Sequence, residues 1–520
     1  MPMLKILVFS LLLIVLAACG RTTPHVSEYP NYSYATANGH YEEDAAEDYA
    51  FAVPSMAIMP HIPLEYIVML DVDPETRIVQ GISRVNFTNR TGQPLDTIVL
   101  RVFLNAFQED VQPRPYSGGL IWRMHRPGEG RGHMDIESVL LNNETAEYKL
   151  DNTILTIYLP EPLAPEAAVQ LILQYSAYVP KLGHRIGGND AGMWFSMFLP
   201  VLAVHGEDGW HIDNFYPIGD PFFLEAANYS VTITTPLSHK VVGTGHRTEE
   251  VIEDTDTRIT RLAASMVRDF AFAVLSQEYN LASTTTDSGI EINLFYHAPI
   301  VGARVDYVLK QARITMEHFE RTVGIYPFGQ VNILEVDLLY DSIASSQMIF
   351  VDTSHLARGN LESMTHSIGS LWFASIVGTN RIAEPWLDKG ITRLVAAGIF
   401  HDTPEDLNDF ISREHAIIAD RTDLFISDGL WAYTRRDNFV NAQGRKPMLM
   451  LHRLQLHMGE EDFWTFVSNY YQAHSFQVAT ADDFIRTAEE VYGSSLRAFF
   501  NVWITRGTIP PLEMMLEVQP

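Results

Sequence analysis

Short segments in which apolar and polar residues alternate fill the chain from about residue 60 to about residue 280. The segment 65–73 (EYIVMLDVD) ends in a Pro74-Glu75-Thr76 turn, and the alternation resumes over 78–86. Alternation with a period of two buries one face of a β-strand. The same pattern recurs between glycine and proline residues at 95–104, 153–159, 169–175, 229–235 and 257–264. We therefore expect an all-β domain over residues 57–282.

After about residue 283 the apolar residues recur at helical spacing. The segment 303–322 predicts an amphipathic helix, followed by a turn and a strand over 331–336. Thr480, with Asp483 three residues later, predicts a capping box at the start of a helix that ends near Gly493. Further helices are expected at 361–377, 448–457, 462–473 and 496–505. The fold class is therefore a multidomain α+β protein, in which a mainly helical domain over 283–520 follows the all-β domain.

The composition is that of a globular protein with substantial cores: 520 residues, of which 47% are hydrophobic and 19% are charged. The formal net charge is −28 and the isoelectric point is about 5.0. An excess of negative charge this large argues against nucleic acid or anionic lipid as the binding partner.

The amino terminus has the pattern of a secretory signal. Lys5 precedes an apolar segment over residues 6–16, which is too short for an ordinary membrane span. The following Leu16-Ala17-Ala18-Cys19 resembles a bacterial lipobox, and Cys19 is the only cysteine, so no disulfide can form. We expect a signal peptide over 1–18, lipidation of Cys19 and anchoring at the extracytoplasmic face of a membrane. Residues 19–56, rich in tyrosine and acid, are expected to form a flexible acidic tether.

Candidate chemistry lies in residues 364–397, MTHSIGSLWFASIVGTNRIAEPWLDKGITRLVAA. This stretch resembles the active-site helices of zinc aminopeptidases of the aminopeptidase N family, which have the gluzincin fold. That family carries H-E-x-x-H followed by W-F, and a third zinc ligand inside W-L-N-E-G. Here Trp372-Phe373 and Trp386-Leu387-Asp388-Lys389-Gly390 match these two anchors. The resemblance covers about residues 60 to 515 and implies a saddle-like β-sandwich domain followed by a thermolysin-like domain.

In the register of this resemblance, the chemical groups of the family are replaced. A catalytic zinc site needs about three His, Asp, Glu or Cys ligands. The second His position is Ser370, which is a poor ligand, and the third-ligand position is Lys389, whose ammonium repels a cation. Ser367 occupies the position of the Glu that serves as general base, and a hydroxyl cannot do that work. Of these groups only His366 remains, so we expect that the ancestral zinc is lost and that the protein has no cofactor.

Two further positions of the resemblance point the same way. The family's G-x-M-E-N-like strand, which binds the amino terminus of the substrate, corresponds to residues 343–350. Ser345 stands at the position of its Glu, and Ser345 and Gln347 are the candidate substrate-binding residues. The Tyr that stabilises the reaction intermediate corresponds to Gly444. The resemblance therefore implies an inactive member, a pseudo-peptidase.

Three hypotheses follow. The first is a lipid-anchored, non-catalytic module that binds a peptide or an envelope protein through the retained cleft. The second is an active zinc aminopeptidase with non-standard ligands, for which His366, Glu362 and Glu384 are the residual candidates. The third is a metal-free hydrolase in which Lys389 activates the hydroxyl of Ser370.

For Lys389 itself the simplest expectation is electrostatic. Its ammonium would take the place of the lost cation and pair with nearby acids such as Glu335 or Glu384.

Overall fold

The computed structural model describes residues 64–108, 131–253, 256–297, 302–401 and 403–513. The predicted signal peptide, Cys19 and the predicted tether lie outside these residues. Within the described ranges, no helix has the length and apolarity needed to cross a membrane.

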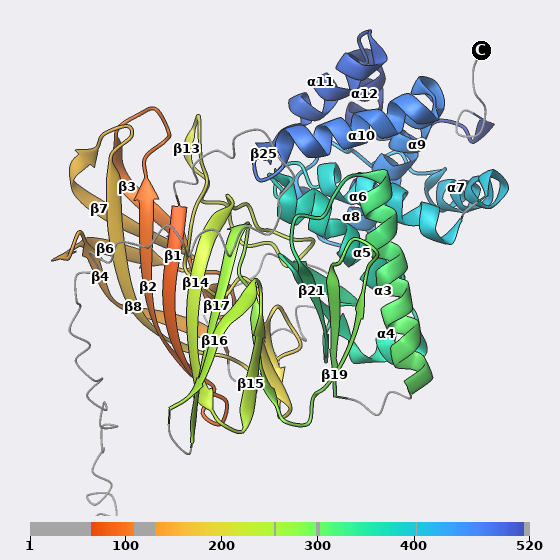
Figure 1. Cartoon of the computed structure of the whole chain (residues 1–520). Coiled ribbons are helices and arrows are strands. Elements are labelled where there is room, and N and C mark those ends of the chain that lie inside the picture. Colours follow the sequence, from red (N-terminus) through yellow and green to blue (C-terminus); the bar gives the residue numbers. More distant parts are fainter. Residues whose placement is uncertain (1–63, 109–130, 254–255, 298–301, 402, 514–520) are drawn as a thin grey trace, which may run out of the picture. The chain divides into compact units, whose positions relative to one another are not determined.

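The first part of the described chain is built on an eight-stranded sheet with the order β16-β17-β14-β1-β2-β8-β4-β5 (Figure 1). Strand β1 pairs with β2 in antiparallel register and with β14 in parallel register. Tyr66, Val68 and Leu70 on β1 are buried and alternate with more exposed residues, as the sequence pattern predicts. The strands are β1 Leu64–Asp73, β2 Ile78–Thr88, β4 His133–Leu141, β5 Glu144–Thr145, β8 Ala168–Tyr178, β14 Ala227–Pro236, β16 His246–Ile252 and β17 Thr257–Val267.

Two four-stranded sheets, β15-β18-β10-β9 and β11-β3-β7-β6, share one hydrophobic core with the large sheet. The strand expected over 95–104 ends at Arg101, because the chain turns there into a short 3-10 helix, η1 (Phe103–Phe107). The remaining strands of this part are β3 Leu95–Arg101, β6 Glu147–Asp151, β7 Ile154–Leu163, β9 Ile186–Asn189, β10 Gly192–Phe195, β11 Val201–Leu202, β12 His205–Gly206, β13 Gly209–Trp210, β15 His239–Gly243 and β18 Phe272–Ser276.

The second part begins with a five-stranded sheet of order β19-β20-β21-β23-β22. Its three central strands run parallel, and the short edge strand β22 runs antiparallel to β23. Strand β19 spans residue 283, the predicted boundary between the two domains. Helix α3 (Gly302–Thr322) packs on this sheet through Val305, Leu309 and Met316. The strands are β19 Asn280–Thr285, β20 Glu291–Tyr296, β21 Gln330–Val336, β22 Ser342–Ser345 and β23 Met348–Asp352.

Helices make up most of the remaining chain, and the β-rich part followed by a helical part agrees with the predicted fold class. The capping box of Thr480 and Asp483 is confirmed, and Gly493 ends that helix in a left-handed conformation. The helices are α4 Thr353–Arg358, α5 Glu362–Ser370, α6 Trp386–Phe400, α7 Pro404–Ile418, α8 Arg436–Val440, α9 Lys446–Met458, α10 Glu460–His474, α11 Ala481–Tyr492 and α12 Arg497–Thr505. Shorter elements are the 3-10 turn η3 Leu430–Ala432, the π-helical segments η2 Leu371–Ile376 and η4 Asn441–Arg445, and the strands β24 Gly378–Thr379 and β25 Val478–Ala479.

The prediction of one α-helix over 361–377 is wrong in its second half. Helix α5 ends at Ser370, and the chain continues as the π-helical segment η2. In this segment the carbonyl groups of Ser375 and Ile376 accept hydrogen bonds from Arg268, a side chain from the β-rich part. A π-helical turn changes the direction of backbone carbonyl groups, and such turns are frequent at functional sites.

Arg268 joins the β-rich part to the helical part through backbone groups. Its buried guanidinium donates to the carbonyl oxygens of Leu224 (2.7 Å), Ser375 (3.3 Å), Ile376 (3.1 Å) and Gln477 (3.0 Å). A buried carbonyl that loses its donor costs about 1–3 kcal/mol. This one side chain therefore satisfies acceptors on segments that are far apart in the sequence.

We predict that Arg268→Lys lowers the free energy of unfolding by about 2–4 kcal/mol, because an ammonium cannot reach four carbonyls arranged around a planar guanidinium. Urea denaturation followed by circular dichroism measures the change. The matched control is Arg90→Lys, at an exposed arginine of the β-rich part, for which we expect no more than about 0.5 kcal/mol. Equal losses in the two variants would contradict the role given to Arg268.

Candidate functional site

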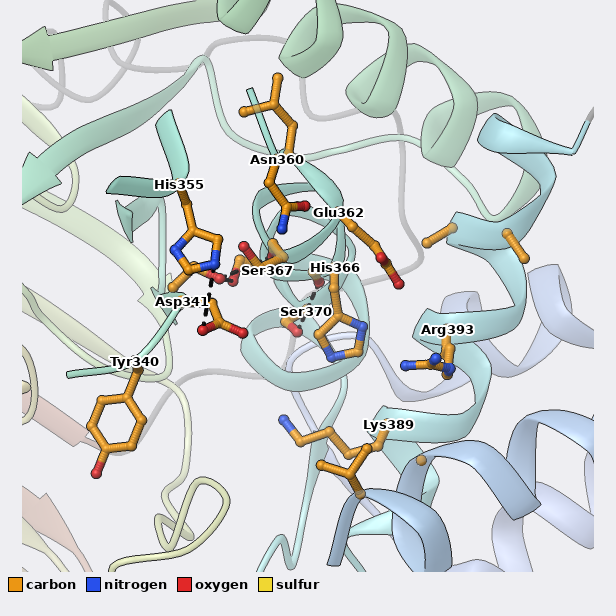
Figure 2. Close-up of a pocket in the computed structure, with 18 of the residues that line it drawn as sticks. Tyr340, Asp341, His355, Asn360, Glu362, His366, Ser367, Ser370, Lys389 and Arg393 are labelled. Atoms are coloured by element: carbon orange, nitrogen blue, oxygen red, sulfur yellow. Dashed lines mark hydrogen bonds and ion pairs between the residues drawn. The ribbon is translucent and has the colours of Figure 1, made fainter. Parts of the chain in front are cut away.

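A cavity of about 810 Å³ lies beside helices α5 and α6 (Figure 2). Five of the positions that were matched to the family in the sequence line this cavity: His366, Ser367, Ser370, Lys389 and Gly444. They come from three separate segments of the chain. The structure therefore brings these five residues together in one cavity.

Helix α5 supplies one wall. His366 and Ser370 are four residues apart and face the cavity from the same side of the helix. The hydroxyl of Ser370 donates to the carbonyl oxygen of His366 (3.1 Å), one turn earlier. Ser367 Oγ lies 2.7 Å from Ser342 Oγ of strand β22. The hydroxyl groups of Ser367 and Ser370 are thus both used in local hydrogen bonds.

His366 lies in the cavity wall, where most of the residue is shielded from solvent. Burial, with the neighbouring charges of Lys389 and Arg393, lowers the pKa of His366 to about 3. The imidazole is therefore neutral at neutral pH, because protonation would add a charge next to two cations.

Lys389 is engaged by two carboxylates. Its ammonium pairs with Asp220, in the loop before β14, and with Asp388 at 3.4 Å. The prediction that Lys389 pairs with Glu335 or Glu384 is wrong, because neither acid pairs with Lys389 among the described contacts. Asp388 adjoins Lys389 in the sequence, and the loop that carries Asp220 lies on the cavity wall.

The two acids that were expected to pair with Lys389 have other partners. Glu335 accepts a hydrogen bond from the amide of His297 (2.8 Å). Glu384 accepts one from the amide of Ala481 at the start of α11 (3.3 Å), and burial raises its pKa. Glu384 is also not among the described residues that line the cavity.

Asp220 is the centre of an ion-pair network. It pairs with Arg185, with Arg381 (2.5 Å) and with Lys389, and Arg381 also reaches Asp388 (3.0 Å). Burial alone would raise the pKa of Asp220, but Arg381, Lys389 and Arg185 hold it well below the usual range of a carboxyl. Asp220 is thus ionised at neutral pH.

A second, smaller network lies on the same side of α6. Arg393 pairs with Glu414 of α7 (2.7 Å), and Arg445 pairs with the same carboxylate (2.9 Å). The sequence analysis missed both networks. Arg393 could have been found, because it stands one helical turn after Lys389 on the same face of the helix. The sequence carries no signal that distinguishes Asp220 or Glu414 from the other acids.

The structure does not bring Ser345 and Gln347 into the cavity. Ser345 Oγ lies 2.8 Å from Ser196 Oγ in a buried contact with the β-rich part, and Gln347 is buried in the turn between β22 and β23 with φ of 60°. Residues Ser342, Ile343 and Ala344 of the same edge strand line the cavity instead.

At Gly444 the backbone faces open space. An added Cβ would meet no atom within 4 Å, so a larger side chain would project freely into the cavity.

The donor atoms of the cavity do not fit zinc. Within the part of the chain that the structure describes, no group of three or more His, Cys, Asp or Glu side chains is gathered in a way that could hold a metal ion. Of the three residual candidates, Glu362 and His366 line the cavity and Glu384 does not. The ammonium of Lys389 adds a positive charge to the same cavity, which disfavours a bound cation there.

Comparison with solved structures defines the class of fold. The M1 zinc metallopeptidase of Deinococcus radiodurans has 16% sequence identity and a TM-score of 0.64, over 86% of this chain and 94% of that one. A mutant of the M1 zinc metallopeptidase from this organism, bound to a Tyr-Ser-Ala substrate, has 17% identity and a TM-score of 0.62 over 86% of this chain and 95% of that one. The chain therefore has the two-domain fold of M1 zinc metallopeptidases.

Sequence comparison gives a weaker link to aminopeptidases. The leucyl aminopeptidase of Saccharolobus solfataricus is 23% identical over 230 residues, which are 39% of this chain and 28% of that protein. The chain thus spans about a quarter of the length of the curated relatives it matches. No family model matches the sequence.

We predict that Asp220→Asn lowers the free energy of unfolding by about 3 kcal/mol, because it leaves three cations around a neutral amide. Thermal and urea denaturation measure the loss. Adding Lys389→Met to this variant removes one of the cations and should restore part of the stability. Asp208→Asn, at an exposed position, is the isosteric control. An Asp220→Asn protein as stable as this control would contradict the network.

The neutral His366 predicts a pH-dependent contribution to stability. In the unfolded chain a histidine has a pKa near 6.5, whereas in the folded protein the pKa of His366 is about 3. Between these values the unfolded state binds one more proton, so this contribution to stability is complete above pH 6.5 and is lost as the pH falls toward 3.

We predict that His366→Gln removes this dependence. The difference in unfolding free energy between wild type and variant should shift, by at most about 1.4 kcal/mol per pH unit, between pH 6.5 and 4. Urea denaturation at a series of pH values measures it. Parallel profiles of the two proteins would show that His366 titrates normally.

Proposed function

We propose that this protein is a lipid-anchored, non-catalytic peptide- or protein-binding module at the extracytoplasmic face of the cell envelope, with a metallopeptidase fold whose zinc site is lost. One observation carries the proposal. At the position that aligns with the third zinc ligand of the fold, the ammonium of Lys389 projects into the cavity and is held by Asp220 and Asp388.

The remaining catalytic positions support an inactive protein. Ser367 stands where the fold's general base would be, and its hydroxyl is hydrogen-bonded to Ser342. Ser370 donates to the backbone carbonyl of His366, and no hydrogen bond joins it to Lys389 in the described chain. This arrangement gives no support to a Ser–Lys hydrolase, because the base of such a pair must contact the nucleophile. No cofactor is part of the proposal.

The cavity itself supports binding. A volume of about 810 Å³ is within the range of clefts that hold drug-sized ligands and short peptides. In the Deinococcus mutant of the same fold, the ligand is a Tyr-Ser-Ala substrate. The proposed partner is a peptide or an envelope protein. The membrane is reached through the predicted lipid anchor at Cys19, and the acidic charge excludes nucleic acid from the proposal.

Zinc content tests the loss of the metal site. We predict that purified protein, incubated with zinc and desalted, retains close to zero zinc per chain by elemental mass spectrometry, because one histidine beside an ammonium cannot hold the ion. An aminoacyl arylamide substrate should remain uncleaved. A stoichiometry near one zinc per chain would overturn this part of the proposal, and substitution of Glu362, His366 and Glu384 would then identify the ligands.

A positive control can be built into the same chain. The double variant Ser370→His with Lys389→Glu adds a His one turn after His366 and a carboxylate at the third-ligand position. We expect it to retain more zinc than wild type and to gain thermal stability when zinc is added.

A further inference from the structure

The ion-pair networks around the cavity contain more cations than carboxylates. In the first network, Asp220 and Asp388 face three cations: Arg185, Arg381 and Lys389. In the second network, Glu414 alone faces Arg393 and Arg445. Each network therefore holds one more positive charge than negative charge. This local excess lies in a protein whose formal net charge is −28.

Each network places a cation of α6 on the cavity wall. Lys389 and Arg393 are one turn apart on α6, and Figure 2 shows both side chains beside His366. Side chains four residues apart on a helix are close enough to share one small ligand group. Arg393 donates one hydrogen bond to a described residue, from an Nη to Glu414 (2.7 Å), although a guanidinium has five donors. The ion pair with Glu414 therefore leaves further N–H donors of Arg393 for a ligand.

The other charges of the wall do not cancel this excess. Asp341 pairs with Arg436 (3.2 Å) and lies 3.6 Å from His355. Glu362 is an exposed residue of the lining, and Arg413 is a further cation in it. A ligand amine would meet two cations at α6 and no counterpart of the family's amine-binding Glu, because Ser345 is buried against Ser196.

The same face of α6 becomes apolar beyond Arg393. Ala396, Ala397 and Phe400 follow at helical spacing and line the cavity, and Phe410 of α7 adds a second aromatic ring. Phe400 is 44% exposed. One face of α6 thus carries two cations followed by an apolar surface. This face is complementary to a ligand in which an acidic group adjoins an apolar side chain.

We infer that the cavity binds a peptide through a carboxylate, which lies between Lys389 and Arg393 while an apolar side chain of the peptide packs along α6 toward Phe400. This inference rests on the proposed peptide-binding function and specifies its ligand class. A site of this kind selects a peptide by an anionic group, whereas a site that recognises the amino terminus selects a cationic group. Charge-assisted hydrogen bonds of this kind are about twice as strong as neutral ones.

Isothermal titration of the full-length protein with four tripeptide probes tests the ligand class. The first probe, N-acetyl-Ala-Ala-Phe, has a free carboxylate. The second probe, N-acetyl-Ala-Ala-Phe amide, carries no charge, and the third, Ala-Ala-Phe amide, has a free amine as its only charged group. N-acetyl-Asp-Ala-Phe amide carries its carboxylate on a side chain. We expect the first probe to bind about tenfold or more tightly than the second and third. Equal binding of the aspartyl probe would still support the inference and would assign the carboxylate to a side chain.

Variants link this preference to α6. Lys389→Met and Arg393→Met should each weaken binding of the free-carboxylate probe about tenfold and leave the uncharged amide unchanged, whereas Lys389→Arg should retain the preference. The control is Lys181→Met, which removes an exposed cation that does not line the cavity. Circular dichroism verifies that each variant is folded, and the two methionine variants test the same site independently.

The outcomes separate this inference from the proposed function. If the uncharged or amine probe binds as tightly as the carboxylate probe, the ligand class is wrong and peptide binding stands. If binding is selective but unaffected by both methionine variants, the placement at α6 is wrong. If none of the four probes binds, both the inference and peptide binding in this cavity are overturned.

Discussion

The candidate site depends on one partly buried carboxylate. Asp220 lies in a loop of the β-rich part and pairs with Arg185 of that part and with Arg381 and Lys389 of the helical part. A buried cation is tolerated only where an opposite charge compensates for its lost hydration. Arg381 and Lys389, which would otherwise repel each other, are therefore held together beside Asp220. Lys389, held in this arrangement, is one of the cations that lower the pKa of His366.

Much of the fold was predictable because it follows from local patterns. The alternation in residues 65–73 and 78–86 gave strands with the right faces buried, and Thr480 with Asp483 marked a helix start. The η2 segment was not predictable in the same way. Its π-helical geometry goes with carbonyl groups that bind Arg268, more than a hundred residues earlier in the chain.

The site was predictable in part, for a related reason. His366, Ser370 and Lys389 were located by motif spacing, and the structure places all three on one cavity. The partner of Lys389 was missed, because Asp220 is separated from it by 169 positions and no sequence pattern joins them. Ser345 was also misplaced: on the short strand β22, the residues before it face the cavity, whereas its own hydroxyl meets Ser196.

The contact made by Arg268 has a consequence for how such a site can change. All four of its acceptors are main-chain oxygens, from Leu224, Ser375, Ile376 and Gln477. Hydrogen bonds to main-chain oxygens do not depend on which side chains the bonded segments carry. Gly378 is an exception, because an added Cβ there would lie 2.1 Å from the Arg268 Cζ. The side chains of α5 that line the cavity take no part in anchoring the segment that follows this helix. Side chains on the cavity face of α5 can therefore be replaced one at a time while this joint stays intact.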